Sequence, residues 1–231
     1  MAINTTSYSP NGWVTIAGTS YRFKRYSGGG GDYTDCLTFT GETSEFTLAV
    51  GSNGAKEWDG TLYYSTDHNT WNIWDGTAIS SANKKLYLRG KGNTKFRTSK
   101  GARLSLSARA GCSGNIQTLL DWESPPTSIS TSSCYSSMFR DCTSLTTAPT
   151  LPATTLAQGC YSSMFYGCTS LTTAPELPAT SLHISCYSSM FRDCTSLTTA
   201  PTLPATTLHI GCYSSMFNGC TKLKLSTTQT T

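Results

Sequence analysis

Cysteine is the reactive residue type that recurs most regularly in this chain of 231 residues, which contains ten cysteines. Eight of them form two series with an interval of 26 residues: Cys134, Cys160, Cys186 and Cys212, and then Cys142, Cys168, Cys194 and Cys220. Thiols in such a pattern could form disulfides, bind a metal ion, or pack as small apolar side chains.

The spacing argues against the first two uses of the thiols. A continuous helix would place Cys134 and Cys142 about 12 Å apart, beyond the limit of about 7 Å between the Cα atoms of a disulfide. Zinc sites favour CxxC or CxxH spacings, which the repeats lack. The pattern therefore favours reduced cysteines that pack in two ladders. Cys36 and Cys112 flank the front segment, and for this pair a bridge stays open.

Histidine offers little further chemistry. His68 falls in a predicted turn, whereas His183 and His209 are one interval apart and should lie side by side. Such a pair could form a weak metal or pH-sensitive site, although solvent exposure is the favoured interpretation. The chain has no GxSxG, HExxH, phosphate-binding or dinucleotide-binding motif. The sequence thus predicts a non-enzymatic protein without a cofactor or metal.

The elements that carry the cysteines form an internal repeat. Copies of this length are typical of a solenoid, in which each unit stacks on the next and none is stable alone. We expect CYSSMF to form a short helical turn, and TTAPTL a brief extended segment limited by its prolines. The inward residues of the first copy should be Met138, Phe139, Leu145, Leu151 and Leu156. The predicted fold is mainly β, with about four 26-residue repeats.

The phrases MFxxCTSL and LPATTL resemble the BspA-type leucine-rich repeats of surface proteins from gut bacteria and their phages. The resemblance covers about residues 119–231, although the array is short and the last copy fades into KLKLSTTQTT. It implies adhesion and partner recognition. We therefore predict a leucine-rich-repeat solenoid over 113–231, in which SGNIQTLLDW forms a short helix that caps the first coil.

The front half reads as short strands separated by turns, which predicts an immunoglobulin-like β-sandwich over 32–112. One hairpin should turn at Asp67, His68 and Asn69. Its expected core face includes Tyr63, Tyr64, Trp71, Ile73 and Trp74. The succession of strand motifs is also similar to a domain that often precedes these repeats in the same surface proteins.

Residues 1–31 contain a second hairpin pattern around Ala17 and Gly18, followed by four glycines that can act as a tether. The segment is either an added edge strand of the sandwich or an arm that docks onto a larger assembly. For an arm, the expected anchors are the aromatic and basic residues Trp13, Tyr21, Phe23 and Arg25.

Charge and hydropathy argue against nucleic acid and against a membrane as the partner. The net charge is only +4, no nucleic-acid motif is present, and no apolar run is long enough to span a membrane. Nine cations lie between Gly76 and Leu120 without any Asp or Glu. We favour a solvated strand face that prevents edge pairing, although a patch for an acidic protein lattice or anionic glycan stays open. These cations are Lys84, Lys85, Arg89, Lys91, Lys95, Arg97, Lys100, Arg103 and Arg109.

Two functions fit these features. The favoured one is a phage virion surface component, a capsid decoration or a fibre, whose N-terminal region holds the particle while its repeats bind a host-surface protein or glycan. The alternative is a bacterial cell-surface adhesin that has lost its signal; the initial Met1 without a signal pattern favours the virion. A homo-oligomer stays open.

The outward repeat positions that differ between copies should contact the partner. These positions are Arg140, Tyr166, Arg192 and Asn218, and Thr150, Glu176 and Thr202.

Overall fold

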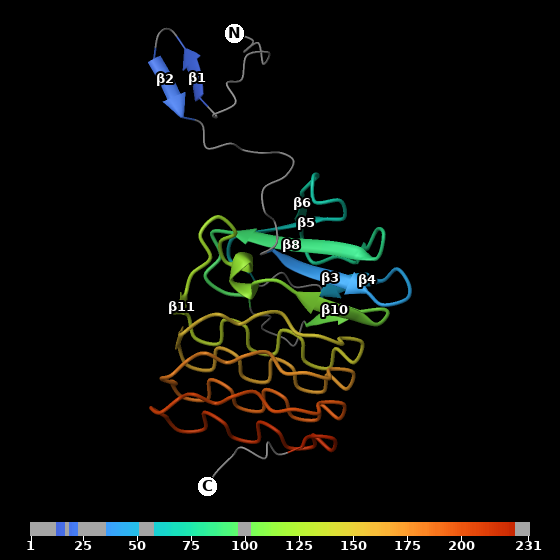
Figure 1. Cartoon of the computed structure of the whole chain (residues 1–231), viewed down its shortest axis with the longest axis vertical. Coiled ribbons are helices and arrows are strands. Elements are labelled where there is room, and N and C mark those ends of the chain that lie inside the picture. The colour runs from blue at the N-terminus through green and yellow to red at the C-terminus, as the bar shows by residue number, and fades with distance from the viewer. Residues whose placement is uncertain (1–12, 17–18, 23–35, 51–57, 97–102, 225–231) are drawn as a thin grey trace. The chain divides into compact units, whose positions relative to one another are not determined.

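The computed structural model describes residues 13–16, 19–22, 36–50, 58–96 and 103–224 (Figure 1). It divides into two compact units, Met1–Tyr33 and Thr34–Thr231. Within the described residues the fold is mainly β, with antiparallel sheets and almost no helix. This agrees with the coarse fold class expected from the sequence.

The first unit contains the hairpin expected near the N-terminus. Strands β1 (Trp13–Ile16) and β2 (Thr19–Arg22) pair antiparallel, with Val14 opposite Tyr21. Of the proposed anchors, Trp13 and Tyr21 lie on these two strands. Phe23 and Arg25 lie outside the described residues, as does the run of four glycines.

The second unit begins with two antiparallel sheets. The larger sheet has the order β10-β3-β8-β5-β6, and the smaller one has the order β7-β4-β9. The larger sheet consists of β10 (Ala110–Ser113), β3 (Leu37–Gly41), β8 (Lys85–Lys91), β5 (Thr61–Ser65) and β6 (Asn72–Trp74). The smaller consists of β7 (Ile79–Ser80), β4 (Thr47–Val50) and β9 (Leu104–Leu106). Alternate residues of β3 and β4 are buried, as expected for strands with one face on a core.

The hairpin formed by β5 and β6 corrects the expected core face. Leu62 pairs with Trp74, and both side chains are buried. Tyr63 pairs with Ile73, whose side chain is 71% exposed. Neighbouring residues of a strand point to opposite faces, so this run of aromatic and apolar residues cannot share one face. Of the five residues named for the core face, only Trp74 is fully buried.

A short 3₁₀ helix, η2 (Ile116–Leu119), connects the sheets to the repeats. Asn115 precedes it, and its side chain accepts a hydrogen bond from the amide of Gln117. All four residues of η2 are buried, in keeping with the short capping helix expected here. The sheet region covers the first copy as well, because the amides of Phe96 and Leu104 donate to the carbonyls of Cys134 and Met138.

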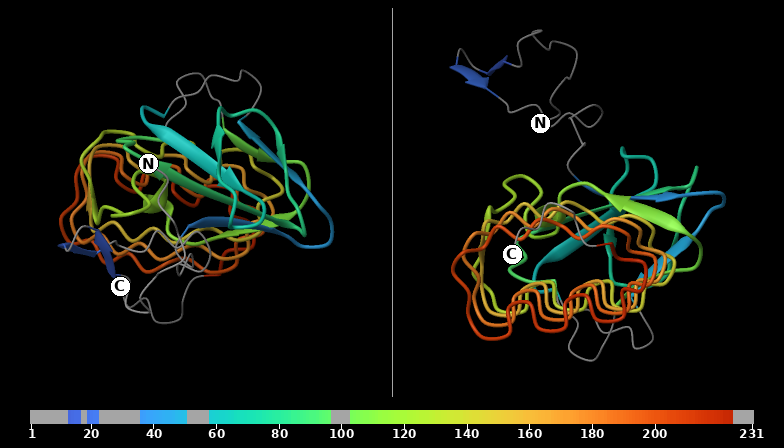
Figure 2. Two further views of the ribbon diagram at one scale, coloured as in Figure 1. Left: turned by 90° about the horizontal axis from the view of Figure 1, so that it is seen from above. Right: turned by 60° about the horizontal axis from the view of Figure 1, so that its bottom comes forward.

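Residues 133–224 form a stack of four copies, the repeat stack, whose flattened turns lie over one another in Figure 2. The CYSSMF segments are successive turns and not the helical turn that we expected. Ser137 and Asp141 have φ angles of 61° and 59°, which no right-handed helix allows. The copies also contain brief extended segments: β12 (Thr155–Leu156) of the first copy pairs in parallel with β11 (Ser128–Ile129), which precedes the first copy.

Hydrogen bonds between the copies explain these turns. At each of the three junctions, five amides in the turns of one copy donate to carbonyls of the next copy. In the first junction the amide of Tyr135 donates to Cys160, that of Ser137 to Ser162, and that of Phe139 to Met164. The left-handed residues turn every second amide toward the following copy, so the main chain bonds between copies instead of within a helix.

Candidate binding surface on the repeat stack

Equivalent side chains of neighbouring copies lie one above another in columns. The rings of Tyr135, Tyr161, Tyr187 and Tyr213, of which the first three are buried, stack with centroids 5.8, 6.0 and 5.9 Å apart. Phe139, Phe165, Phe191 and Phe217 form a second column, with centroids 5.5, 5.7 and 5.8 Å apart. The core residues thus hold the copies in one register, so outward residues at equivalent positions must also form columns.

The first outward column contains Arg140, Tyr166, Arg192 and Asn218, and we call it the arginine–tyrosine column. The guanidinium carbon of Arg140 lies 4.4 Å from the centre of the Tyr166 ring, and that of Arg192 lies 5.7 Å from it. All three side chains are half-buried, whereas Asn218 is exposed. The structure therefore brings these residues together as one surface made of an aromatic ring between two cations.

In each copy, the residue that directly follows the arginine–tyrosine column is either an aspartate or a glycine. Arg140 Nε lies 3.8 Å from Asp141, and Arg192 Nε lies 3.7 Å from Asp193. Arg103, on the sheet region, also pairs with Asp141. The second copy has Gly167 at this position, where a Cβ atom would lie 2.5 Å from the Asp141 carboxylate. Acidic and neutral residues thus alternate, which keeps like charges out of direct contact.

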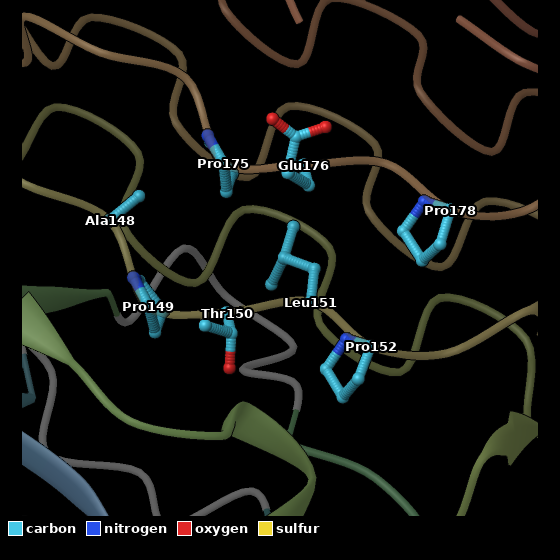
Figure 3. A pocket seen from close by; sticks show the side chains of 8 residues that line it. All are labelled: Ala148, Pro149, Thr150, Leu151, Pro152, Pro175, Glu176 and Pro178. Carbon is cyan, nitrogen blue, oxygen red and sulfur yellow. The ribbon is translucent and has the colours of Figure 1, made fainter. Parts of the chain in front are cut away.

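The second outward column contains Thr150, Glu176 and Thr202, beside a hollow of about 190 Å³. Four prolines of two adjacent copies line this hollow together with Leu151 (Figure 3): Pro149, Pro152, Pro175 and Pro178. The Thr202 hydroxyl donates to the Glu176 carboxylate over 3.3 Å. The hollow offers mainly apolar contacts with one carboxylate at its edge. The only pattern in the sequence that points to this hollow is the recurrence of APxLP in the first three copies.

The repeat cysteines are not placed for chemistry. All ten cysteines are free thiols in the structure. The thiols of Cys168 and Cys194 donate to the carbonyls of Phe139 and Phe165 in the preceding copies, each over 3.0 Å. Burial raises the pKa of Cys134, Cys160 and Cys194 to about 12. A thiol reacts and binds metals as the thiolate, so these groups are unreactive at neutral pH.

Cys36 and Cys112 differ from one another. Cys112 is fully buried, and burial raises its pKa well above the ordinary value. Cys36 Sγ lies 3.6 Å from His68 Nε2, a contact that the sequence did not predict. Burial, followed by the charge of Lys85, lowers the pKa of His68. A lowered pKa disfavours the charged imidazolium, which is the form that would stabilise a Cys36 thiolate by charge.

The prediction that His183 and His209 lie side by side is confirmed. The rings of His183 and His209 stack with centroids 5.4 Å apart, and both residues are exposed. The Ile184 amide donates to His183 Nδ1 over 2.9 Å. Within the described ranges, no group of three or more His, Cys, Asp or Glu residues could hold a metal ion.

The run of cations between Gly76 and Leu120 does not form one patch of free charge. Arg89 lies between the rings of Trp71 and Trp122, at 3.9 and 4.1 Å from their centres. Lys91 pairs with Asp121 and Glu123. Arg109 pairs with Glu42 and Arg103 with Asp141, while Arg97 and Lys100 lie outside the described residues. Residues distant in sequence thus supply acidic partners for Lys91, Arg103 and Arg109, which the run itself lacks.

No protein-family model, curated protein or solved structure that was compared with the chain matches it. In the part of the chain that the structure describes, no helix is long and apolar enough to cross a membrane. The candidate site consists of the arginine–tyrosine column and of the proline-lined hollow on the repeat stack.

Proposed function

We propose that the chain is a non-enzymatic recognition protein of a phage virion surface, either a capsid decoration or a fibre. In this proposal the repeat stack is a BspA-like leucine-rich-repeat solenoid, and the two sheets are an immunoglobulin-like sandwich that covers its first coil. The N-terminal hairpin holds the molecule on the particle. The repeats bind a host-surface protein or glycan.

One observation carries the proposal, which is the contrast between constant and variable columns. The inward Tyr and Phe columns keep the same residue in every copy, whereas the outward column changes from Arg140 to Tyr166, Arg192 and Asn218. A rigid frame with variable outward residues is suited to recognition, because its surface can change while its core stays the same.

The chemistry of the two surfaces indicates the class of partner. Aromatic rings and guanidinium groups are the side chains that concentrate binding energy at interfaces. Tyr166, held between two cations, presents both kinds at one place. The proline-lined hollow adds apolar contacts next to hydroxyl and carboxylate groups. A surface protein or a glycan with polar and anionic groups fits this combination, and no step of the proposal needs a catalytic residue.

The location of the native protein tests the proposal. Purified virions and cell envelopes from an infected culture would be probed with an antibody against the recombinant chain. We expect the protein to sediment with virions at a constant ratio to the capsid protein. Recovery with the envelopes of uninfected cells, and not with virions, would favour the bacterial adhesin instead. Recovery only as free protein would contradict both functions.

A further inference from the structure

Among the described residues, Glu176 is the only acidic residue of the repeat stack that lacks an ion pair. The other two, Asp141 and Asp193, lie 3.8 and 3.7 Å from the Nε atoms of arginines in the same copies. Glu176 is exposed, and its carboxylate accepts a hydrogen bond from the hydroxyl of Thr202. At this position the stack presents a carboxylate whose charge a ligand can balance.

The extended segments of the stack are otherwise neutral, and Glu176 is their only charged residue. These segments are residues 145–156, 171–182 and 197–208. A lone carboxylate in neutral surroundings attracts a cationic group and repels an anionic one. The arginine–tyrosine column has the opposite preference, because it presents two guanidinium groups. The two surfaces of the candidate site therefore select different chemical groups.

The hollow next to Glu176 favours an apolar stem over a sugar ring. Its four prolines provide no backbone N–H groups, and the Leu151 side chain lies between the two pairs of prolines (Figure 3). The hydroxyl groups of a sugar that entered the hollow would lose water without gaining enough hydrogen-bond partners. A chain of methylene groups needs no such partners, so it is the better occupant.

The size of the hollow limits the occupant to a single side chain. The hollow has a volume of about 190 Å³, whereas pockets that enclose drug-sized ligands have about 300–1,000 Å³. Proline fixes its own φ angle, so the four prolines hold the walls of the hollow in place before a ligand arrives. A side chain can therefore enter without first ordering the walls.

The hydrogen bond to Glu176 favours lysine over arginine as this side chain. The Thr202 hydroxyl donates to Oε2 of Glu176 over 3.3 Å, which leaves Oε1 for the ligand. A guanidinium group pairs best with both oxygens of a carboxylate, whereas an ammonium group needs only one. A lysine can also lay its methylene groups along an apolar surface while its ammonium group stays in water at the rim.

We propose that the proline-lined hollow binds an exposed lysine side chain of a partner protein. The methylene groups of this lysine pack against the four prolines and Leu151, and its ammonium group donates to the carboxylate of Glu176. The inference rests on the proposed function, in which the repeats recognise an outside partner. It adds that this surface recognises a protein, and not a glycan.

The probe is a lysine whose main chain is blocked at both ends, Nα-acetyl-lysine methylamide. The full chain is titrated with it at constant ionic strength, and the amide resonances of Leu151, Glu176 and Leu177 are followed by NMR. We expect these resonances to shift in a saturable manner. The blocked norleucine, which has the same stem without the ammonium group, should bind about two- to fivefold more weakly. The blocked diaminopropionate, which has the charge on a shorter stem, should bind about threefold more weakly or less tightly still.

Matched variants locate the binding. Glu176→Gln keeps the shape of the side chain without its charge, and it should weaken binding of the blocked lysine by about two- to fivefold. Glu123→Gln removes an exposed carboxylate that pairs with Lys91, outside the repeat stack, and it should leave binding unchanged. The exposed positions of both residues make unfolding by either change unexpected.

Four results would overturn the proposal. They are no saturable shift with the blocked lysine, equal binding of the norleucine compound, equal weakening in the two variants, and tighter binding of methyl glucoside than of the blocked lysine at the same resonances. The titration uses only the purified chain, whereas the proposed function is tested by the recovery of the native protein with virions or envelopes. A failure of one is therefore distinguishable from a failure of the other.

Discussion

At the scale of single residues, the cysteines show how burial separates structural from reactive thiols. Each series occupies the same place in successive copies, and the thiols donate to carbonyls of the preceding copy, as Cys168 does to Phe139. The interval of 26 residues was enough to predict ladders of reduced cysteines. The acceptors could not be predicted, because they depend on how far each copy is displaced along the stack.

We predict that the eight repeat cysteines are reduced in the native protein. Alkylation of the unfolded chain without a reductant should label all eight, as measured by mass spectrometry. Alkylation of the folded chain at pH 7.5 should label few of them, because their pKa values are raised by burial. Intact disulfides within the repeats would contradict the ladder.

The same thiols should make the fold sensitive to alkali. The folded-state pKa of Cys194 is about 12, whereas an unfolded thiol has a pKa of about 8.5. The folded state therefore holds the proton more tightly, and the free energy of unfolding should fall as pH rises above about 8.5. Urea midpoints measured from pH 7 to pH 10.5 should show this fall. Cys194→Ala should show a smaller fall, and equal slopes in both proteins would contradict the assignment.

At the scale of elements, the repeat alternates in charge as well as in shape. Asp141 and Asp193 have φ angles of 59° and 60°, and Gly167 and Gly219 have φ angles of 70° and 79° at the equivalent positions. All four positions thus need the left-handed region, which glycine adopts without strain and Asp or Asn tolerate. The acidic residue is placed only in every second copy, beside an arginine.

Replacing Gly167 should measure the cost of breaking this alternation. Gly167→Asp places a carboxylate between those of Asp141 and Asp193, whereas Gly167→Asn has nearly the same shape without the charge. Both should lower the free energy of unfolding, and Asp should lower it by about 0.2–1 kcal/mol more than Asn. Chemical denaturation at low salt measures the difference, which should shrink at high salt. No difference between the two variants would contradict the electrostatic explanation.

The interior columns should carry much of the stability. Phe165 is fully buried between Phe139 and Phe191, and Leu171 is fully buried as well. Phe165→Ala or Leu171→Ala should cost about 2–5 kcal/mol through the cavity that is left. The exposed Ile73→Ala serves as the control and should change the denaturation midpoint little. Unchanged midpoints for the two core variants would contradict the stacked arrangement.

The sequence predicted the repeat elements better than the front half. The interval, the inward Met, Phe and Leu residues and the β5–β6 hairpin could all be read from residue patterns. The expected helical turn was wrong, because left-handed residues such as Ser137 turn the amides toward the next copy. The assignment of Ile73 to the core was also wrong, since adjacent aromatic and apolar residues hide which face of the strand is inside.

At the scale of the whole molecule, Met1–Tyr33 forms a unit of its own, and Thr34–Thr231 forms the other. The sheets and the repeats belong to one unit because strand β10 and the residues around it donate to the first copy. Removing residues 1–27 should therefore leave the second unit folded. Circular dichroism and the denaturation midpoint of the truncated chain should match those of the full chain.

The central claim is that the N-terminal hairpin attaches the molecule while the repeats recognise a partner. Co-sedimentation of the full chain, of a chain lacking residues 1–27 and of the double variant Arg140→Ala, Arg192→Ala would be measured with virions that lack the protein and with host cells. We predict that the truncated chain loses binding to virions and keeps binding to cells. The double variant should keep binding to virions and lose binding to cells. Equal binding of all three proteins to both particles would contradict the account.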